Sequence, residues 1–306
     1  MSIPLTALVL VVASSLGWSG FDLLRKLLVR EVAPVALLFL LTAGTVPLFA
    51  VWLAIDGVPA PGPGYLAPAL GSVLLNVVAN LLFLTGMRQA PISITIPLLS
   101  LTPVFTTLTA IPLLGERPSA AGVTGILLVI AGAIWLNWPR RWADPTDPTD
   151  PTDLAPEAPA PGEHRRSLGG ALMVAGTALL WSLTPPLDKL AVERASAPFH
   201  ALVLTAGVAL AVLLVLAVQG GLGELGGVRH VPGLLALALL VSAAALGLQL
   251  LALPLVFVGT IETLKRGIGN CMALVYGRTL FGEAVTLPKI LAVGLMAAGV
   301  GLILGF

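Results

Sequence analysis

The chain contains 306 residues, of which 57% are hydrophobic and only 10% are charged, and its mean hydropathy is +1.01. About a quarter of the residues of a soluble domain are charged, so this composition excludes a soluble protein and predicts an integral membrane protein. The net charge of +1 offers no basis for binding nucleic acid, and no nucleic-acid partner is expected.

Apolar runs of about 20 residues, the length that crosses the hydrocarbon core, follow one another along the chain. They are too long and too uniformly apolar for the strands of an outer-membrane barrel, so we expect an all-α fold with ten transmembrane helices. The first helix should be retained, because residues 1–4 lack the charged start of a signal peptide. The expected helices cover residues 4–24, 33–55, 66–87, 92–114, 119–138, 168–187, 199–218, 232–253, 259–281 and 286–304.

Residues 139–167 are too polar and too rich in proline to cross a membrane. They contain Asp-Pro-Thr three times in succession, starting at Asp144, and this composition predicts a disordered linker. A regulatory tail or partner site is the alternative to a simple tether. The linker separates a first unit, residues 1–138, from a second unit, residues 168–306, and each unit has five expected helices.

The second unit repeats residues of the first. Two units of five helices joined by one short linker must have opposite orientations in the membrane. We therefore predict two inverted five-helix repeats that give alternating access to a central site. Residues 163 positions apart agree between Trp18-Ser19, Leu24, Lys26, Leu27, Thr42-Ala43-Gly44 and Trp181-Ser182, Leu187, Lys189, Leu190, Thr205-Ala206-Gly207, and Gly115-Glu116 returns as Gly282-Glu283.

Basic residues indicate how these helices are oriented. Apart from Lys265 and Arg266, which lie well inside an expected helix, fourteen basic residues remain, and eleven of them fall in odd-numbered connections or in the helix ends beside them. The positive-inside rule then places the linker in the cytoplasm and both termini outside.

Several stretches resemble a known family. The sequence from Leu82 to Pro91, continuing through Pro97 and Pro103 to the segment Leu114-Gly115-Glu116-Arg117-Pro118-Ser119, resembles the end of the EamA domain of the drug/metabolite transporter superfamily. The segment Leu280-Phe281-Gly282-Glu283 and the two Trp-Ser pairs fit the same pattern. The resemblance covers the chain apart from the linker. It implies a ten-helix transporter with inverted repeats and a central cavity, and it leaves the substrate open among amino acids, nucleotide sugars, organic phosphates and drugs.

The two Gly-Glu pairs, Gly115-Glu116 and Gly282-Glu283, predict turns between helices. Each glycine can end a helix in the left-handed conformation, and Ser119 and Thr286 can cap the helices that follow. The carboxylate of each pair is favourable beside the positive end of the next helix. Gating or ion coupling is the functional alternative for these glutamates.

Glu262, Lys265 and Arg266 are charged residues inside the expected ninth helix. A charge at the bilayer centre costs roughly 2.5–3.5 kcal/mol or more, so such residues normally face a cavity. Glu262 can pair with either cation on one helical face, which leaves one cation uncompensated. The group is either a site for an anionic substrate, as in the resembling organic-phosphate translocators, or a structural ion pair. The first repeat has Leu98 and Leu99 at the positions of the two cations.

Amides and tryptophans complete the predicted substrate-binding site. Amides inside a bilayer need partners, which are neighbouring helices or a ligand. A tryptophan near the end of a span either anchors the membrane interface or lines the cavity. These further site residues are Asn76, Asn80, Gln249, Asn270, Trp18 and Trp181, whereas Asp22, Arg25, Lys26, Asp188 and Lys189 are expected in charge clusters at helix ends.

Proline and glycine mark expected bends and close contacts. Pro97 and Pro103 should kink the fourth helix, and Pro185 and Pro186 the sixth. Glycines in the fifth and tenth helices suit close packing, either within the chain or between the protomers of a homodimer. These glycines are Gly122, Gly125, Gly132, Gly294 and Gly299.

These observations favour a secondary transporter of the inner membrane that moves a small, anionic or phosphorylated metabolite by alternating access. A flippase for a lipid-linked or phosphorylated sugar is the alternative. The expected partners are a small-molecule substrate and the lipid bilayer, and no cofactor or metal is expected. Because the chain lacks a G-x-x-x-x-G-K-[ST] loop, transport should use a gradient, and Glu262 is the candidate for proton coupling.

An enzyme is not expected. His164, His200 and His230 lie outside the expected helices or at their ends, and none has a partner at ligand spacing. Cys271 is the only cysteine, which excludes an intrachain disulfide, and its position in an apolar run predicts packing rather than reactivity.

Overall fold

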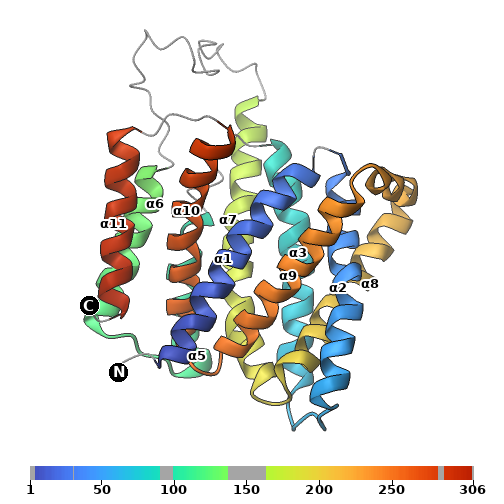
Figure 1. Ribbon diagram of the computed structural model, residues 1–306, viewed down its shortest axis with the longest axis horizontal. Coiled ribbons are helices and arrows are strands. Elements are labelled where there is room, and N and C mark those ends of the chain that lie inside the picture. The colour runs from blue at the N-terminus through green and yellow to red at the C-terminus, as the bar shows by residue number, and fades with distance from the viewer. Residues whose placement is uncertain (1–3, 30, 90–98, 137–162, 282–285, 305–306) are drawn as a thin grey trace.

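The structure is a computed structural model that describes residues 4–29, 31–89, 99–136, 163–281 and 286–304. Within these ranges all regular structure is helical (Figure 1). The helices before the linker are α1 (Leu5–Leu28), α2 (Pro34–Asp56), α3 (Leu66–Gln89), α5 (Thr102–Leu114) and α6 (Ala120–Leu136). Those after it are α7 (Glu163–Val192), α8 (Ala197–Val218), the 3-10 helix η1 (Gly221–His230), α9 (Pro232–Ala252), α10 (Val258–Phe281) and α11 (Leu287–Leu304).

Six of the described helices, α1, α2, α3, α7, α8 and α9, are long and apolar enough to cross a membrane. In hydrocarbon a helix satisfies its own backbone hydrogen bonds, which is why apolar runs of this length become helical. The helices α5, α6 and α11 are apolar but shorter, and α10 has 24 residues but carries several charges. The protein is therefore a multi-pass, helical membrane protein.

Some boundaries differ from those expected. α1 continues to Leu28 and α7 to Val192, because charged residues fit the last turn of a helix. Arg25 and Lys26 thus lie in the last turn of α1 and Lys189 in that of α7, rather than in connections. The expected linker lies outside the described residues as far as residue 162. α7 begins at Glu163.

The fourth expected span is interrupted directly before Pro103. Leu99 is helical, residues 100 and 101 form a turn, and α5 begins at Thr102 with Pro103 in its first turn, where a missing amide hydrogen costs no helical hydrogen bond. Pro97 lies outside the described residues. Pro185 and Pro186 lie inside α7 as expected, and α2 contains a further proline, Pro47.

The Gly-Glu turn after α5 is confirmed. Gly115 ends the helix in the left-handed conformation, with φ 68° and ψ 14°, which a side chain would disfavour. Ser119 Oγ accepts a hydrogen bond from the amide of Gly122 at 3.1 Å and so caps α6. The second pair, Gly282-Glu283, lies outside the described residues.

The helices form one bundle in which α6 and α11 lie side by side at one edge and α2 and α8 at the opposite edge (Figure 1). The most extensive packing joins a helix from before the linker to one from after it: α3 with α7, α6 with α11, α1 with α9, and α2 with α8. The same holds for the packing of α1 with α10 and of α5 with α7. If corresponding helices of the two halves are exchanged, this set of contacts is unchanged.

Hydrogen bonds between helices follow the same rule. Ser14 Oγ of α1 donates to the carbonyl of Ala245 in α9 at 2.8 Å. Thr177 Oγ1 of α7, 163 positions after Ser14, donates to the carbonyl of Ala79 in α3 at 3.3 Å. The two bonds join corresponding positions of the two halves. Because Ala245 is 166 positions after Ala79, residues of α9 correspond to residues of α3 that lie 166 positions earlier.

Close approaches at glycine agree with this offset. A Cβ atom added to Gly44 in α2 would lie 2.7 Å from the side chain of Leu239 in α9. Added to Gly207 in α8, it would lie 2.9 Å from the side chain of Val73 in α3. Gly207 is 163 positions after Gly44, and Leu239 is 166 positions after Val73. The two halves therefore contact each other through equivalent residues.

The glycines of α6 and α11 allow these helices to touch within one chain. A Cβ atom on Gly125 would lie 2.5 Å from the carbonyl oxygen of Gly299, and one on Gly132 would lie 2.7 Å from that of Ala292. The close packing expected of Gly125, Gly132 and Gly299 is thus intramolecular. A homodimer stays a prediction.

Candidate functional site

Four of the predicted site residues meet between α1, α9 and α10. Trp18 Nε1 donates to Oε1 of Gln249 at 2.7 Å, and Lys265 Nζ lies 3.5 Å from the same oxygen. Lys265 also pairs with Glu262 one helical turn earlier. The indole of Trp18 completes the group, with the ammonium of Lys265 5.8 Å from its ring centroid. We call these four residues the central cluster.

The central cluster is a polar group inside an apolar bundle. Glu262 is 2% exposed, whereas the side chain of Lys265 is 23% exposed, so the carboxylate is buried and the ammonium reaches the edge of the cluster. α1 continues for ten residues beyond Trp18. This tryptophan therefore lies in the middle of its helix rather than at a membrane interface, and the interpretation as a cavity residue is the one that its position supports.

Arg266 is the cation that Glu262 leaves uncompensated. Glu262 pairs with Lys265 and not with Arg266, and among the described residues the Nε atom of Arg266 is buried without a hydrogen-bond partner. A guanidinium stays charged at any physiological pH. The sequence predicted one spare cation here, and the tertiary structure assigns it to Arg266.

Trp181 occupies the corresponding position in the other half but has apolar neighbours. Its ring centroid lies 5.3 Å from that of Phe83 in α3, and it packs with Leu99 in the same cluster. With the offset of 166 between α3 and α9, Phe83 corresponds to Gln249. With the 167 positions that separate Gly115 from Gly282, Leu99 corresponds to Arg266. The same arrangement is therefore polar in one half and apolar in the other.

The remaining predicted site residues are not joined to the central cluster. Asn76 donates to the carbonyl of Ser72 at 3.0 Å and Asn80 to that of Asn76 at 2.7 Å, so both amides bond to the preceding turn of α3. Asn270 lies 3.7 Å from the sulfur of Met296 in α11. Asn76 and Asn80 are thus satisfied within α3, and only the contact of Asn270 joins two helices. A ligand role for the three amides stays a prediction.

The two prolines of α7 leave two backbone carbonyls without amide donors, and threonine hydroxyl groups donate hydrogen bonds to them instead. Pro185 and Pro186 cannot donate to the carbonyls of Trp181 and Ser182 four residues earlier. Thr184 Oγ1 donates to the carbonyl of Trp181 at 3.1 Å. A side chain of α5 donates to the other, since Thr109 Oγ1 lies 3.2 Å from the carbonyl oxygen of Ser182. These bonds fix α5 against α7 beside Trp181.

Glu116 joins three elements at one end of the bundle. Its Oε1 accepts from Nζ of Lys189 in α7 at 2.8 Å, and its Oε2 accepts from the amide of Val258 at the start of α10 at 2.9 Å. The glutamate is 7% exposed. The expectation that it stabilises the helix directly after it is therefore wrong, because it caps α10, 142 residues further along the chain. Lys189 lies in the last turn of α7 as expected, and its partner there is the buried Glu116.

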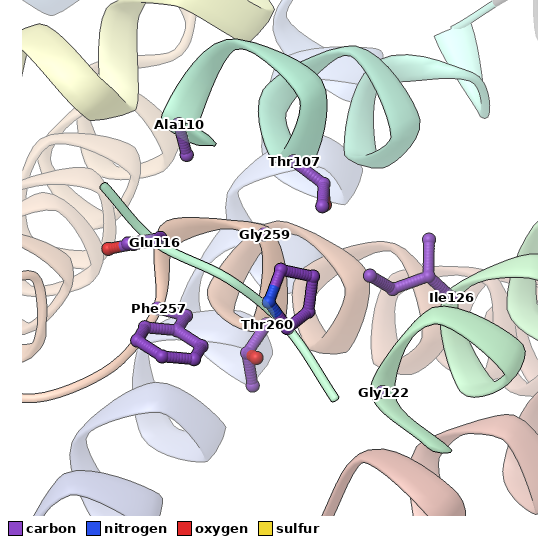
Figure 2. Close-up of a pocket in the computed structure, with 9 residues that line it drawn as sticks. Thr107, Ala110, Glu116, Gly122, Ile126, Phe257, Gly259 and Thr260 are labelled. Carbon is purple, nitrogen blue, oxygen red and sulfur yellow. The ribbon is translucent and has the colours of Figure 1, made fainter. Parts of the chain in front are cut away.

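A small hollow lies beside this junction (Figure 2). Figure 2 shows the loop with Glu116 passing Phe257 and Gly259 of the α10 start, with Thr107 of α5 and Gly122 of α6 around it. About 20 Å³ of the hollow can be reached by the centre of a water molecule, which is room for one or two waters. This volume excludes the hollow itself as a metabolite site.

A second buried network contains two residues whose role the sequence did not reveal. Asp188 Oδ1 accepts from Ser72 Oγ and lies 3.0 Å from Nε2 of His200, whose Nδ1 lies 3.4 Å from the hydroxyl of Tyr65. His200 is 0% exposed and Asp188 4%. Asp188 lies near the end of α7 as expected, but its partners are Ser72 and His200. His200, expected to lack a ligand-spaced partner, is paired across the α7–α8 turn. By contrast, Asp22 and Arg25 form the expected exposed pair at 2.9 Å.

Within the described residues, no group of three or more histidine, cysteine, aspartate or glutamate side chains could hold a metal ion.

Residues 5–138 match the EamA-like transporter family, which belongs to the drug/metabolite transporter superfamily. The first half of the chain is an EamA-like domain. The resemblance seen in the sequence is thereby confirmed for this half. Members of the family are membrane transporters and not enzymes, and the EamA-like domain contributes Trp18 to the central cluster and Glu116 to the junction with α10.

The fold of the whole chain is also found in a solved structure. That structure, described only as "Crystal structure of protein", has a TM-score of 0.71 and 18% sequence identity, over 97% of this chain and 95% of the other. At this identity the likeness shows the fold alone, and it includes the half beyond the EamA-like domain. No curated protein sequence matches the chain.

Proposed function

We propose that the protein is a secondary transporter of a small anionic or phosphorylated metabolite, with the central cluster and Arg266 as its substrate site. The observation that carries the proposal is the buried Nε of Arg266, which has no partner among the described residues. A buried donor without an acceptor costs about 1–3 kcal/mol, and more when it is charged. An anionic group of the substrate would satisfy it, since guanidinium groups bind carboxylate and phosphate with two parallel hydrogen bonds.

The apolar counterpart around Trp181, Phe83 and Leu99 supports a division of the site into two parts. Lys265 and Arg266 would bind the anionic group, and the aromatic pair would contact the organic part of the same substrate. Trp181 sits on α7 beside the prolines, so a change in the α7 bend would move it. Asn76, Asn80 and Asn270 are proposed as further contacts of the substrate.

Alternating access is supported by the equivalent contacts of the two halves. Ten membrane spans in two inverted repeats would allow the halves to exchange conformations, so that the site opens to either side in turn. The positive-inside rule favours an inner membrane with the linker in the cytoplasm. The transporter class of the EamA-like domain supports the same mechanism.

Thermal stabilisation of the purified protein by candidate substrates tests the proposal. The panel contains inorganic phosphate, dicarboxylates, sugar phosphates and amino acids. At least one anion should raise the unfolding temperature, and Arg266→Ala should weaken its binding at least tenfold, as expected from the loss of about 1.5–3 kcal/mol for a hydrogen bond to a charged group. Lys265→Ala should weaken it too, and Arg278→Ala, which removes an exposed cation of α10, should not.

If both Arg266→Ala and Lys265→Ala leave every thermal shift unchanged, the anionic site is wrong. Stabilisation by a lipid-linked sugar phosphate alone, with no effect of free sugar phosphates, would instead indicate the flippase. Transport of the binding anion into proteoliposomes under an imposed gradient then separates a transporter from a binding protein.

A further inference from the structure

The network of Tyr65, Ser72, Asp188 and His200 lies between the two halves of the protein. Tyr65 and Ser72 belong to the first half, in and just before α3, whereas Asp188 is in α7 and His200 in α8. All four are buried, with His200 and Ser72 at 0% exposed. The network is separate from the central cluster, and its one link to the proposed substrate contacts among the described residues is Asn76, whose Nδ2 lies 3.4 Å from Ser72 Oγ.

The other half of the protein closes the corresponding junction without a polar network. Three of the four counterparts are apolar and pack in one hydrophobic cluster, and the fourth is an exposed arginine paired with Asp22. The counterparts are Leu37 for His200, Ala238 for Ser72, Val231 for Tyr65 and Arg25 for Asp188. This architecture therefore does not require buried polar groups at the junction, and replacing such groups by apolar ones is often neutral or stabilising.

We propose that Asp188 and His200 form a proton-binding site whose occupancy controls how the segment 57–65 is held against α8. Asp188 needs donors, which Ser72 and the Nε2–H of His200 supply, so in the unprotonated state Nδ1 accepts from Tyr65. Proton binding adds H⁺ to the lone pair of Nδ1 and gives an imidazolium beside the Asp188 carboxylate. Nδ1 then donates instead of accepting, and the Tyr65 hydroxyl must turn its hydrogen elsewhere.

The surroundings of His200 bring no other titratable group into this exchange. Burial, with Asp188 as the smaller cause, raises the pKa of Tyr65 to about 12, so the phenol stays protonated while an imidazole titrates. Lys189 is turned to Glu116, and Arg194 in the α7–α8 turn donates to the carbonyl of Leu190 at 3.0 Å.

The helices packed beside α8 leave the pair isolated as well. Glu193 of the α7–α8 turn is exposed, α9 carries no charged residue, and the single charge of α2, Asp56, is exposed at its end. Imidazoles are the side chains that change charge between about pH 5 and pH 8. A proton bound here thus acts on a junction between the two halves.

The backbone shows which segment a proton would affect. Tyr65 ends the segment 57–65, which is otherwise attached by the hydrogen bond from the amide of Gly62 to the carbonyl of Arg194 at 2.7 Å. Tyr65 also makes an edge contact with the ring of Phe199, next to His200. Reversal of the Tyr65–His200 bond deprives the buried hydroxyl hydrogen of Tyr65 of its acceptor. Because a buried donor without an acceptor is unfavourable, the attachment of this segment to α8 is weakened.

The test treats the proton as the ligand and varies the pH. Protein labelled with ¹⁵N-histidine in lipid nanodiscs is titrated from about pH 5 to about pH 8, and His200→Gln assigns the signal of His200. In parallel, hydrogen exchange of residues 57–65, corrected for the chemical exchange rate, reports local opening. We expect the His200 signal to titrate and the exchange of this segment to rise about tenfold at the acidic end.

Three variants separate a proton site from a structural network. His200→Gln keeps an Nε donor for Asp188 and cannot titrate, so exchange of residues 57–65 should lose its pH dependence. His230→Gln, which replaces another histidine of the chain, should keep it. The triple variant Ser72→Ala, Asp188→Asn, His200→Leu removes both titratable groups and gives positions 72 and 200 the residue types of their counterparts Ala238 and Leu37. It should unfold at or above the wild-type temperature without pH dependence.

Two results would overturn the proposal. One is an imidazole of His200 that keeps the same protonation over the whole range. The other is a triple variant that fails to fold, because the network would then hold the fold together. Neither result bears on Arg266, so the substrate site is tested independently.

Discussion

At the scale of single residues, the site is organised by one carboxylate and two cations. Glu262 is three residues before Lys265 and four before Arg266, and helical geometry alone allows either pair. The fold selects Lys265, because Gln249 and Trp18 stand on neighbouring helices where the ammonium can contact them. Arg266 is left without a carboxylate partner among the described residues.

Replacement of Glu262 by glutamine should strengthen anion binding. The variant leaves two cations uncompensated instead of one, and a charge about 6 Å away contributes about 3 kcal/mol at an effective dielectric constant near 20. Affinity for the anion found in the thermal-shift panel should rise at least tenfold, measured by isothermal titration calorimetry. Any pH-driven uptake that depends on this carboxylate should disappear.

A suitable control is Glu193→Gln, which removes an exposed carboxylate at the end of α7. Weaker anion binding in Glu262→Gln, with the control unchanged, would show that Glu262 contacts the substrate directly rather than compensating Lys265. Unchanged pH-driven uptake in Glu262→Gln would exclude this residue from proton coupling.

At the scale of elements, the structure depends on a few contacts between helices distant in sequence. Glu116 connects the α5–α6 loop with α7 and α10 through both carboxylate oxygens. Gly125 and Gly299 allow α6 and α11 to cross with backbone in contact. The hydroxyl of Thr109 connects α5 to a carbonyl of α7.

Glu116→Ala should destabilise the bundle more than Glu116→Gln. Alanine leaves the ammonium of Lys189 and the amide of Val258 without partners, and breaking a buried ion pair costs about 3–5 kcal/mol. Glutamine keeps an acceptor for the amide. Thermal unfolding followed by circular dichroism should rank the proteins as wild type, Glu116→Gln and Glu116→Ala.

The neighbouring exposed cation offers a control for this ranking, since Arg117→Ala should leave the unfolding temperature unchanged. Equal unfolding temperatures for wild type and Glu116→Ala would contradict the assignment of Glu116 as a buried junction.

Gly125→Ala should weaken the packing of α6 on α11. The added methyl would lie 2.5 Å from the carbonyl oxygen of Gly299, so the helices must separate, and overpacking of this kind costs about 1–3 kcal/mol. Gly294→Ala in α11, where nothing lies within 4 Å, is the matched control and should be neutral. An equal effect of both substitutions on thermal unfolding would exclude the crossing at Gly125.

At the scale of the whole molecule, the halves are equivalent in their contacts and different in their chemistry. Ser14 and Thr177 make corresponding hydrogen bonds, whereas the surroundings of Trp18 are polar and those of Trp181 apolar. The equivalent contacts are the basis of the alternating access proposed above, and the different chemistry is the basis of the proposed two-part substrate site.

Substrate should move the two ends of the bundle in opposite senses. In a Cys271→Ser background, spin labels at Val58 and Arg117 report one end, and labels at Val29 and Leu280 the other; all four residues are exposed. Because alternating access closes one end as the other opens, saturating anion should shorten one distance and lengthen the other, as measured by pulsed electron resonance. Parallel changes at both ends would contradict alternating access.

Much of this protein follows from its sequence. Apolar runs of membrane-spanning length can only form helices in lipid, and the repeated residues place corresponding positions in both halves. Charges and amides are so rare in such a chain that Trp18, Gln249, Glu262 and Lys265 could be selected as site residues before any contact was known. Local rules also predicted the turn at Gly115 and the cap at Ser119.

Only the tertiary structure decided which partners the buried polar groups take. Lys189 lies 73 residues from Glu116, Val258 lies 142 residues from it, and Ser72 lies 116 residues from Asp188. No spacing rule reaches across such separations, because the pairing depends on how helices pack and not on the period of one helix. For that reason the sequence determined the membrane class, the family and the residues of the central cluster, and packing alone brought Asp188 and His200 together.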